Sequence, residues 1–174
     1  EYSLKSLRSK ISVVMQRTSL FKGTIESNML VGNQQATIED IQWALNVSQS
    51  AEFVASKSDG IKTIVSQNGK NFSGGQKQRL TIARALVKKP EILILDDSSS
   101  ALDYATDLKL RTELKNLPNM TVFIVSQRTS SIQNADKIIV LDDGQMVGIG
   151  THDQLINTCD VYKEIYNSQF QRKG

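Results

Sequence analysis

Three short apolar runs, each bounded by polar residues, constrain the fold of this 174-residue sequence more than any other feature. The runs cover residues 92–95, 122–125 and 138–141, and they consist of Ile, Val, Leu and Phe. Each run is too short for a helix, and its β-branched residues favour a strand. Continuous apolar character is typical of strands that are buried on both faces of a parallel sheet. Residues 11–15 predict an earlier strand of the same kind.

Segments with helical periodicity lie between these predicted strands. Residues 73–88 place apolar side chains on one stripe, opposite Gln and basic residues, and Pro90 follows. Residues 107–117 predict a second helix, which Pro118 ends. Residues 24–58 have no strand pattern and predict several short helices. Alternating strands and helices, interrupted by a helical insertion, indicate the α/β class.

The C-terminal part of the sequence predicts a hairpin followed by two helices. Residues 142–144 are a turn signal between the apolar runs 138–141 and 146–149. Residues 151–153 are typical of a helix start, and residues 161–170 predict a last amphipathic helix.

Composition narrows the class of protein. With 39% hydrophobic and 22% charged residues, the sequence is typical of a globular domain rather than a disordered one. A net charge of +3, spread in mixed signs, is too weak to indicate a nucleic-acid partner, so we expect no nucleic acid. No run approaches the ~20 apolar residues that a membrane span needs. The single cysteine, Cys159, cannot form an internal disulfide, which favours a reducing compartment.

A pair of glycines at the start of a long predicted helix marks a candidate phosphate site. Gly74 and Gly75 follow Ser73, and glycines let the backbone approach a ligand closely. A helix N-terminus adds unpaired N–H groups and partial positive charge. Alone, this pattern more often indicates a simple capped helix. The whole run from Phe72 to Gln76, however, resembles the signature motif LSGGQ of ABC ATPases, with Phe72 in place of Leu.

Two strand ends carry candidate Mg²⁺ ligands. Asp96 ends the predicted strand 92–95, and a carboxylate there can hold Mg²⁺ as the Walker B Asp of P-loop NTPases does. A strand-end Asp can also be a simple turn cap, but the neighbouring signature motif favours the metal role. Gln16 closes the first predicted strand, and residues 16–28 resemble the Q-loop region of ABC exporters. The resemblance implies that the amide oxygen of Gln16 contacts Mg²⁺.

Further motifs follow in the order that the family has. Residues 100–103 resemble the D-loop, which crosses the dimer interface and here ends in Asp103. Residues 125–128 occupy the switch position, with Gln127 as the switch residue. Residues 150–155 resemble the closing segment of exporter domains. The resemblance covers nearly the whole chain, and it implies a partial P-loop NTPase (ABC ATPase) core with a parallel sheet and an inserted helical subdomain.

The resemblance also implies a division of the chain and a set of contacts. We expect residues 1–16 to form part of the ATPase core and residues 17–90 to form the helical subdomain with Q-loop and signature motif. We expect residues 91–174 to complete the core with Walker B, D-loop, switch and C-terminal helices. The implied contacts with ATP and Mg²⁺ come from Gln16, Ser73, Gly74, Gly75, Gln76, Asp96 and Asp103, with Gln16 and Asp96 on the metal.

The sequence lacks the phosphate-binding motif G-x-x-x-x-G-K-[ST] of this family. Its Gly69-Lys70 pair is followed by Asn71 and does not fit. The family places this Walker A loop upstream of what is Glu1 here. We therefore expect the sequence to be a fragment of a longer polypeptide, and we expect the fragment alone to be inactive.

Two residues that the resemblance makes catalytic also depart from the family pattern. Asp97 stands where hydrolytic members have a Glu that polarises the attacking water, and its carboxylate is one methylene shorter. Gln127 stands where they have His; it can hydrogen-bond a γ-phosphate but does not titrate near neutral pH. Both belong to one half-site, whereas the intact signature motif serves the opposite half-site.

This pattern resembles one half of a heterodimeric exporter with one degenerate and one competent site. It implies an ATPase subunit at the cytoplasmic face of the cell membrane, paired with a second ABC nucleotide-binding domain and joined to a transmembrane domain of the same polypeptide. Two alternatives are a soluble ABC ATPase of the DNA-repair or ribosome-associated type, and a non-catalytic interaction fragment. The exporter-like residues 16–28 and 150–155 favour the transporter.

Overall fold

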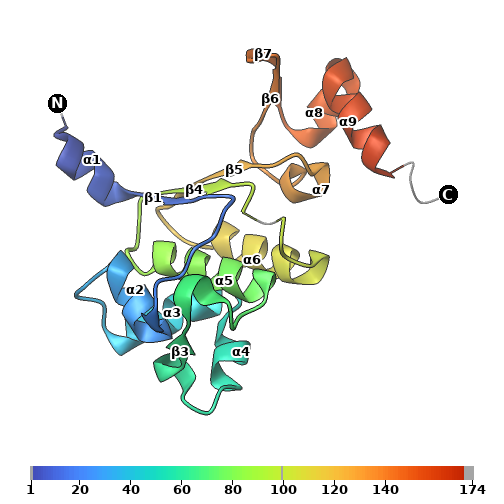
Figure 1. Cartoon of the computed structure of the whole chain (residues 1–174). Helices are drawn as coiled ribbons and strands as arrows, with labels where there is room; N and C mark the ends of the chain where they lie inside the picture. Colours follow the sequence, from blue (N-terminus) through green and yellow to red (C-terminus); the bar gives the residue numbers. More distant parts are fainter. Residues whose placement is uncertain (1, 99, 171–174) are drawn as a thin grey trace. The chain divides into compact units, whose positions relative to one another are not determined.

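A computed structural model of the chain describes residues 2–98 and 100–170. The chain forms two compact units, Glu1–Val125 and Ser126–Gly174. Figure 1 shows the order of the elements in each unit. The three-part division that the resemblance implies stays a prediction.

The first unit contains a parallel sheet of β1 (Ile11–Val14), β4 (Ile92–Asp96) and β5 (Thr121–Val125), in the order β1-β4-β5. In this register Val14 lies opposite Leu95 on the neighbouring strand. All three strands lie within one residue of their predicted bounds, and the predicted α/β class with a parallel sheet is confirmed.

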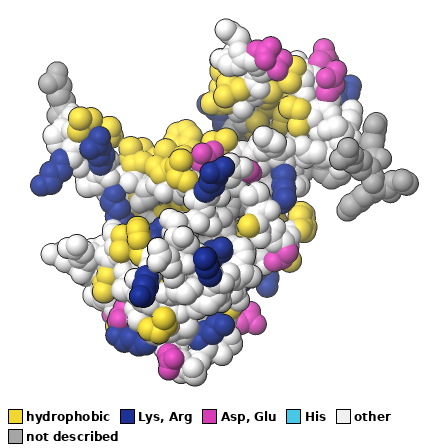
Figure 2. All heavy atoms as spheres, viewed as in Figure 1, with side chains coloured by type: hydrophobic (Ala, Val, Ile, Leu, Met, Phe, Trp, Pro, Cys, Tyr) yellow, Lys and Arg dark blue, Asp and Glu magenta, His cyan; other side chains and the backbone are white. Residues whose placement is uncertain are grey.

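The expectation that these strands are buried on both faces is wrong. Val14 and Leu95 point into the core, whereas Val13, Phe123 and Val125 are 50%, 52% and 55% exposed. Side chains alternate between the two faces of a strand, and the helices of this unit pack against one face only. The hydrophobic surface over the strands is visible in Figure 2.

Five helices make up most of the helical part of this unit: α2 (Ile25–Gly32), α3 (Ile38–Val47), α4 (Ala51–Ala55), α5 (Gly74–Leu86) and α6 (Tyr104–Lys115). The short elements among and before them are α1 (Leu4–Lys10), β2 (Gly23–Thr24), η1 (Gly60–Lys62), β3 (Ile64–Val65) and η2 (Gln67–Gly69). The predicted helix over residues 73–88 is confirmed by α5, and the short helices expected among residues 24–58 are present as α2, α3 and α4.

Helix α6 begins earlier than the sequence pattern predicts. It starts at Tyr104 rather than at residue 107, because Asp103 caps it. The Asp103 carboxylate accepts hydrogen bonds from the Thr106 amide (3.0 Å) and the Thr106 hydroxyl (2.7 Å). An N-cap of this kind satisfies a free donor of the first turn.

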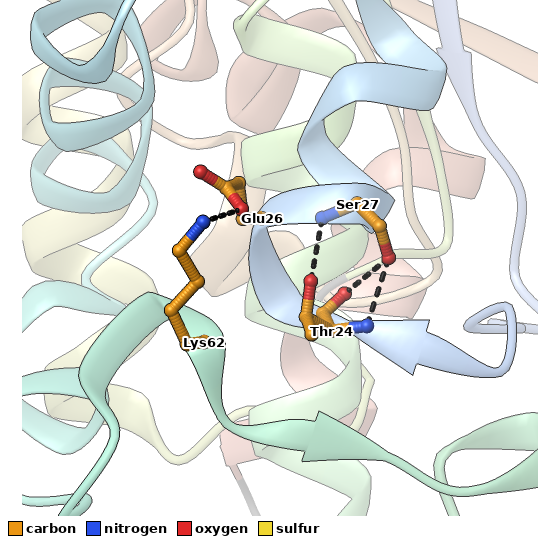
Figure 3. Close-up of polar contacts among 4 residues, drawn as sticks. All are labelled: Thr24, Glu26, Ser27 and Lys62. Carbon is orange, nitrogen blue, oxygen red and sulfur yellow. Dashed lines mark hydrogen bonds and ion pairs between the residues drawn. The ribbon is translucent and has the colours of Figure 1, made fainter.

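The start of α2 is fixed by local polar contacts, which Figure 3 shows. The Ser27 amide donates to the Thr24 hydroxyl at 3.0 Å, and the Thr24 amide donates to the Ser27 hydroxyl at 2.8 Å. This reciprocal capping box sets where the helix begins. An ion pair between Glu26 and Lys62 joins the helix to η1.

Helices α2 and α5 approach so closely that only a glycine fits at position 32. A Cβ atom on Gly32 would lie 2.1 Å from the carbonyl oxygen of Arg84 and 2.8 Å from Cγ1 of Val87. This contact packs α5, which begins with the glycine pair, against α2. Helix α2 follows the loop of residues 16–24 (the 16–24 loop).

The second unit consists of α7 (Thr129–Ile132), β6 (Ile138–Asp142), β7 (Gln145–Gly150), α8 (His152–Thr158) and α9 (Asp160–Phe170). Both helices predicted for the C-terminal part are present as α8 and α9. Tyr162 and Leu155 are almost fully buried in the core of this unit.

The predicted hairpin is confirmed, since β6 and β7 pair antiparallel. Asp143 and Gly144 form its two-residue turn, with φ angles of 46° and 76°. Two-residue hairpin turns need such positive values, which Gly adopts freely and Asp tolerates. The expected burial on both faces is wrong for β6 as well, because Ile139 and Leu141 are 54% and 66% exposed.

None of the helices across residues 2–98 and 100–170 has both the length and the apolar character that crossing a membrane requires.

Candidate functional site

The carboxyl ends of β1 and β4 bring together three of the predicted site residues. Gln16 follows β1, Asp96 is the last residue of β4, and Asp97 comes next. The side-chain nitrogen Nε2 of Gln16 donates to Oδ2 of Asp97 at 2.8 Å. Ligands of parallel α/β sheets bind at this edge, beyond the carboxyl ends of the strands. The structure thus joins the predicted Q-loop residue to the predicted water-polarising carboxylate.

The backbone of Asp97 is held in a sparsely populated conformation. Its φ angle is 43°, in the left-handed region, where Asp is among the better tolerated residues. The Asp97 amide donates to the carbonyl of Val125 at 2.9 Å, and its carbonyl accepts from the Ser100 hydroxyl at 3.1 Å. These bonds tie the turn after β4 to the end of β5, so the Asp97 side chain leaves from a fixed backbone.

The donor set at this edge fits Mg²⁺. Proteins usually hold Mg²⁺ by one or two carboxylates together with substrate phosphates, rather than by a complete cage of side chains. Asp96 is half-buried at the strand end and supplies a carboxylate. Because the amide nitrogen of Gln16 is engaged with Asp97, the oxygen of that amide is the atom left for a cation. In the described part of the chain no group of three or more His, Cys, Asp and Glu residues is suited to a metal.

The glycine pair lies at an exposed helix N-terminus. Ser73 caps α5: its hydroxyl accepts from the Gln76 amide at 3.2 Å, and Oε1 of Gln76 accepts from the Ser73 amide at 3.1 Å. Ser73 and Gly74 are exposed. The simple capping interpretation is therefore correct for Ser73, and it leaves the positive end of the α5 dipole open to an anion.

The segment that resembles the D-loop packs against the same glycines. A Cβ atom on Gly75 would lie 3.1 Å from the carbonyl oxygen of Ala101. Leu102, next in sequence, is buried. Asp103 is exposed and caps α6, and hydrogen bonds from the Thr106 amide and hydroxyl lower the pKa of its carboxyl. The first turn of α5 and the turn before α6 thus form one surface.

The predicted switch residue, Gln127, lies in the second unit, where its side chain is exposed. Its backbone carbonyl accepts a hydrogen bond from Nε2 of Gln169, at the end of α9, at 2.6 Å. Oε1 of Gln169 accepts from the amide and the hydroxyl of Thr129 at 2.9 Å and 3.0 Å. Sequence reasoning did not single out Gln169, because its partners lie 40 and 42 positions away.

Sequence reasoning also missed a cluster in which Asn28 and Arg84 contact the backbone of the 16–24 loop. Asn28 is 1% exposed; its amide group accepts from the amide of Phe21 and donates to the carbonyls of Phe21 and Thr24, each at 2.9 Å. Arg84 of α5 donates to the carbonyl of Ser19 at 3.0 Å and lies over the Phe21 ring. Burial lowers the pKa of the Arg84 guanidinium. The sequence signal that could have indicated this cluster is the polar Asn28 within the mostly apolar segment of α2.

The sequence model of the family described as ABC transporter matches residues 1–100. The chain belongs to the ABC transporter family. This ABC transporter chain is 42% identical over 170 residues to the ABC transporter ATP-binding protein YfiB of Bacillus subtilis, a match that covers 98% of the chain and 30% of YfiB. It is 38% identical over 172 residues to an ATP-dependent lipid A-core flippase of Vibrio vulnificus, covering 98% of the chain and 30% of the flippase.

A solved structure gives the same result for the fold of this ABC transporter chain. It is titled the structure of a bacterial Atm1-family ABC exporter with ATP bound. The TM-score is 0.92 at 34% identity, and the match covers 97% of the chain and 30% of the exporter. The predicted ABC ATPase fold is therefore confirmed. The chain spans about 30% of the length of the curated relatives it matches.

Proposed function

We propose that the chain is part of an ATP-binding subunit that powers export of a substrate across a membrane. The observation that carries the proposal is the hydrogen bond of Gln16 to Asp97 at the carboxyl edge of the sheet, beside Asp96. It joins a predicted metal ligand to the predicted water-polarising carboxylate, which supports a shared role of the two residues at the ATP site. The similarity to exporters and to a flippase supports the transport function.

Each site residue has a proposed role in ATP hydrolysis. Asp96 and the amide oxygen of Gln16 hold Mg²⁺, which when bound would neutralise charge on the ATP phosphates. Asp97 orients the attacking water, and Gln127 donates a hydrogen bond to the γ-phosphate. The signature residues contact the γ-phosphate of the opposite half-site, and Asp103 lies at the dimer interface; the signature residues are Ser73, Gly74, Gly75 and Gln76.

We further propose that the two half-sites are unequal. The side chain of Asp97 is one methylene shorter than that of the Glu in hydrolytic members, and one of its carboxylate oxygens already accepts a hydrogen bond from Gln16. Gln127 cannot take up and release a proton as His does. The half-site built on these two residues is therefore degenerate, and the competent site combines the signature motif of this chain with residues of a different nucleotide-binding domain.

The proposal places the chain at the cytoplasmic face of the cell membrane. Its partners would be a transmembrane domain of the same polypeptide and the second nucleotide-binding domain of a heterodimer. The 16–24 loop and its anchors on α2 and α5 form the segment that would pass movement between the ATP site and the membrane domain.

The test is ATP turnover by the full-length protein in lipid vesicles, alone and together with its partner subunit. The proposal predicts little Mg-ATP hydrolysis by the full-length protein alone and robust hydrolysis by the pair. A partner variant without its own Walker B glutamate should inactivate the pair. Full turnover by this subunit alone would contradict the heterodimer and the degenerate half-site together.

A further inference from the structure

The side chain of Gln169, in the last turn of α9, bonds to the predicted switch segment, residues 127–129. Gln169 makes hydrogen bonds with three atoms of residues 127–129: the carbonyl of Gln127, the amide of Thr129 and the hydroxyl of Thr129. Its amide group uses the nitrogen as donor and the oxygen as a double acceptor, which is nearly the full capacity of a glutamine side chain.

The amide and hydroxyl of Thr129, which bond to Gln169, need a hydrogen-bond partner within the protein. Thr129 is 2% exposed, so water does not readily replace the bonds to its amide and hydroxyl. Thr129 is also the first residue of α7, and its neighbour Arg128 makes no side-chain cap of that helix. Gln169 therefore does for α7, from a distant helix, what an N-cap residue does locally.

The helix that carries Gln169 is well packed in the second unit. Helix α9 is anchored by Tyr162, which is 2% exposed and packs in the core of the second unit with Leu155 and Ile138. The hydroxyl of Tyr162 is hydrogen-bonded to Nδ1 of His152 at 2.8 Å. A side chain near the end of such a helix can fix a loop, because the helix itself is fixed.

We propose that Gln169 is a positioning residue for the switch: it holds residues 127–129 in one backbone conformation, from which the side chain of Gln127 meets the γ-phosphate. The inference rests on the proposed function for the role of Gln127, but not for the clamp itself. It makes the C-terminal helix α9 part of the nucleotide site, although Gln169 touches no nucleotide.

Amide hydrogen exchange of this chain tests the clamp without any ATPase activity. Gln169→Met keeps the length of the side chain and removes all three bonds. Gln169→Glu keeps the acceptor for Thr129 and removes the donor to Gln127. We expect the Thr129 amide to exchange about tenfold faster in Gln169→Met and to stay protected in Gln169→Glu. The matched control is Ser168→Ala, whose hydroxyl bonds only the Ile165 carbonyl of its own helix.

A second measurement separates positioning from simple anchoring of the helix. In the full-length transporter with its partner, the preference of this half-site for ATP over ADP reports the γ-phosphate contact. We expect Gln169→Met and Gln127→Ala to lower the preference alike, by about fivefold, which is typical of one lost hydrogen bond. Ser168→Ala should keep it.

The outcomes distinguish the inference from the proposed function. Unchanged exchange at Thr129 in Gln169→Met would overturn the clamp. A preference lowered by Gln127→Ala but not by Gln169→Met would overturn the positioning role. If Gln127→Ala itself changes nothing, the proposed role of Gln127 is wrong, and the clamp is judged on the exchange at Thr129 alone.

Discussion

The side-chain amides of Gln16 and Gln169 bond to residues 81 and 40–42 positions away, and the amide of Asn28 links the 16–24 loop to the start of α2. An amide group donates and accepts at once, so one side chain can satisfy two backbone groups of a loop without burying a charge. In this chain the three amides stabilise three loops. Gln16 bonds to the carboxylate of Asp97, Asn28 bonds to the backbone of the 16–24 loop, and Gln169 bonds to the backbone of residues 127–129.

Asn28 offers a stability test of this principle. Asn28→Ala removes the Asn28 partner of the Phe21 amide and of the Phe21 carbonyl, whereas the Thr24 carbonyl keeps its bond from the Ser27 hydroxyl. Unpaired buried groups of this kind cost about 1–3 kcal/mol each, so we expect the two groups together to cost about 2–6 kcal/mol in urea unfolding. Asn46→Ala is the control, because Asn46 is an exposed residue of α3 and should change stability by less than ~0.5 kcal/mol. Equal effects would show that the cluster does not hold the loop.

Asp103 gives a prediction about acid. Its pKa is lowered in the folded chain because the Thr106 amide and hydroxyl donate to the carboxylate. Its contribution to stability is therefore fully present above the ordinary aspartate pKa of about 4, and it is lost as the pH falls through the lowered value. We expect Asp103→Asn, which still caps α6 but does not titrate, to lose less stability than the parent chain between about pH 4 and pH 2. Parallel stability profiles of the two proteins over this range would refute the cap.

The sequence predicted which residues belong to the candidate site, but it did not predict which residues they contact. The strand-end position of Asp96 and the cap of Ser73 follow from local sequence, because strands and helix starts have short-range signals. The bond of Gln16 to Asp97 spans 81 positions, and Gln169 reaches back 42 positions. No periodicity encodes such contacts, since they arise only when the sheet and the second unit assemble.

At the scale of elements, the length of a helix or strand and the regularity of its apolar pattern determined whether the sequence predicted it. Helix α5 and strand β4 have long or uniform apolar patterns and were predicted nearly to the residue. Helix α1 buries none of its residues, so it left no amphipathic signal. Strands β2 and β3 have two residues each, which is too short for any alternation. The open face of the parallel sheet was missed because an apolar residue is equally apolar on a covered and an uncovered face.

The close packing of α2 on α5 predicts a strongly destabilising substitution. Gly32→Ala brings a Cβ atom within 2.1 Å of the Arg84 carbonyl oxygen, and a backbone atom cannot move aside as a side chain can. We expect overpacking to cost about 1–3 kcal/mol or more in thermal or urea unfolding. Gly74→Ala is the matched control, because its Cβ would meet only the Ala101 Cβ at an ordinary 3.9 Å. A Gly32→Ala protein as stable as Gly74→Ala would show that the two helices are not in firm contact.

At the scale of the whole molecule, we expect this chain to supply only part of the proposed nucleotide site. It has the strand-end carboxylates, the signature helix and the switch segment, but no G-x-x-x-x-G-K-[ST] motif in its sequence. In P-loop NTPases that loop cradles the phosphates with backbone amides and a lysine. In the proposed function, the residues that the chain does supply serve mainly Mg²⁺ and a second nucleotide-binding domain.

The isolated chain is therefore expected to bind Mg-ATP weakly and not to hydrolyse it. Isothermal titration of the chain with Mg-ATP should give no saturable heat at micromolar concentrations. A full-length protein that carries the motif serves as the positive control. Micromolar affinity of the isolated chain would mean that the described residues form a complete nucleotide site on their own.

The central claim is that this chain serves the competent site through its signature motif, while its own half-site is degenerate. Gly74→Asp puts a bulky, negative side chain at the positive end of α5, where the γ-phosphate of the opposite half-site would lie. Asp97→Ala removes the altered water-polarising carboxylate of the half-site that this chain itself builds. The two variants therefore report on different sites.

The measurement is ATP turnover of both variants in the reconstituted heterodimer. We expect Gly74→Asp to lower turnover by on the order of 10²–10³, as the loss of preorganised donors to a phosphate does, and Asp97→Ala to lower it only modestly. Equal losses, or a larger loss in Asp97→Ala, would show that the half-site of Asp97 and Gln127 performs the hydrolysis and would contradict the account.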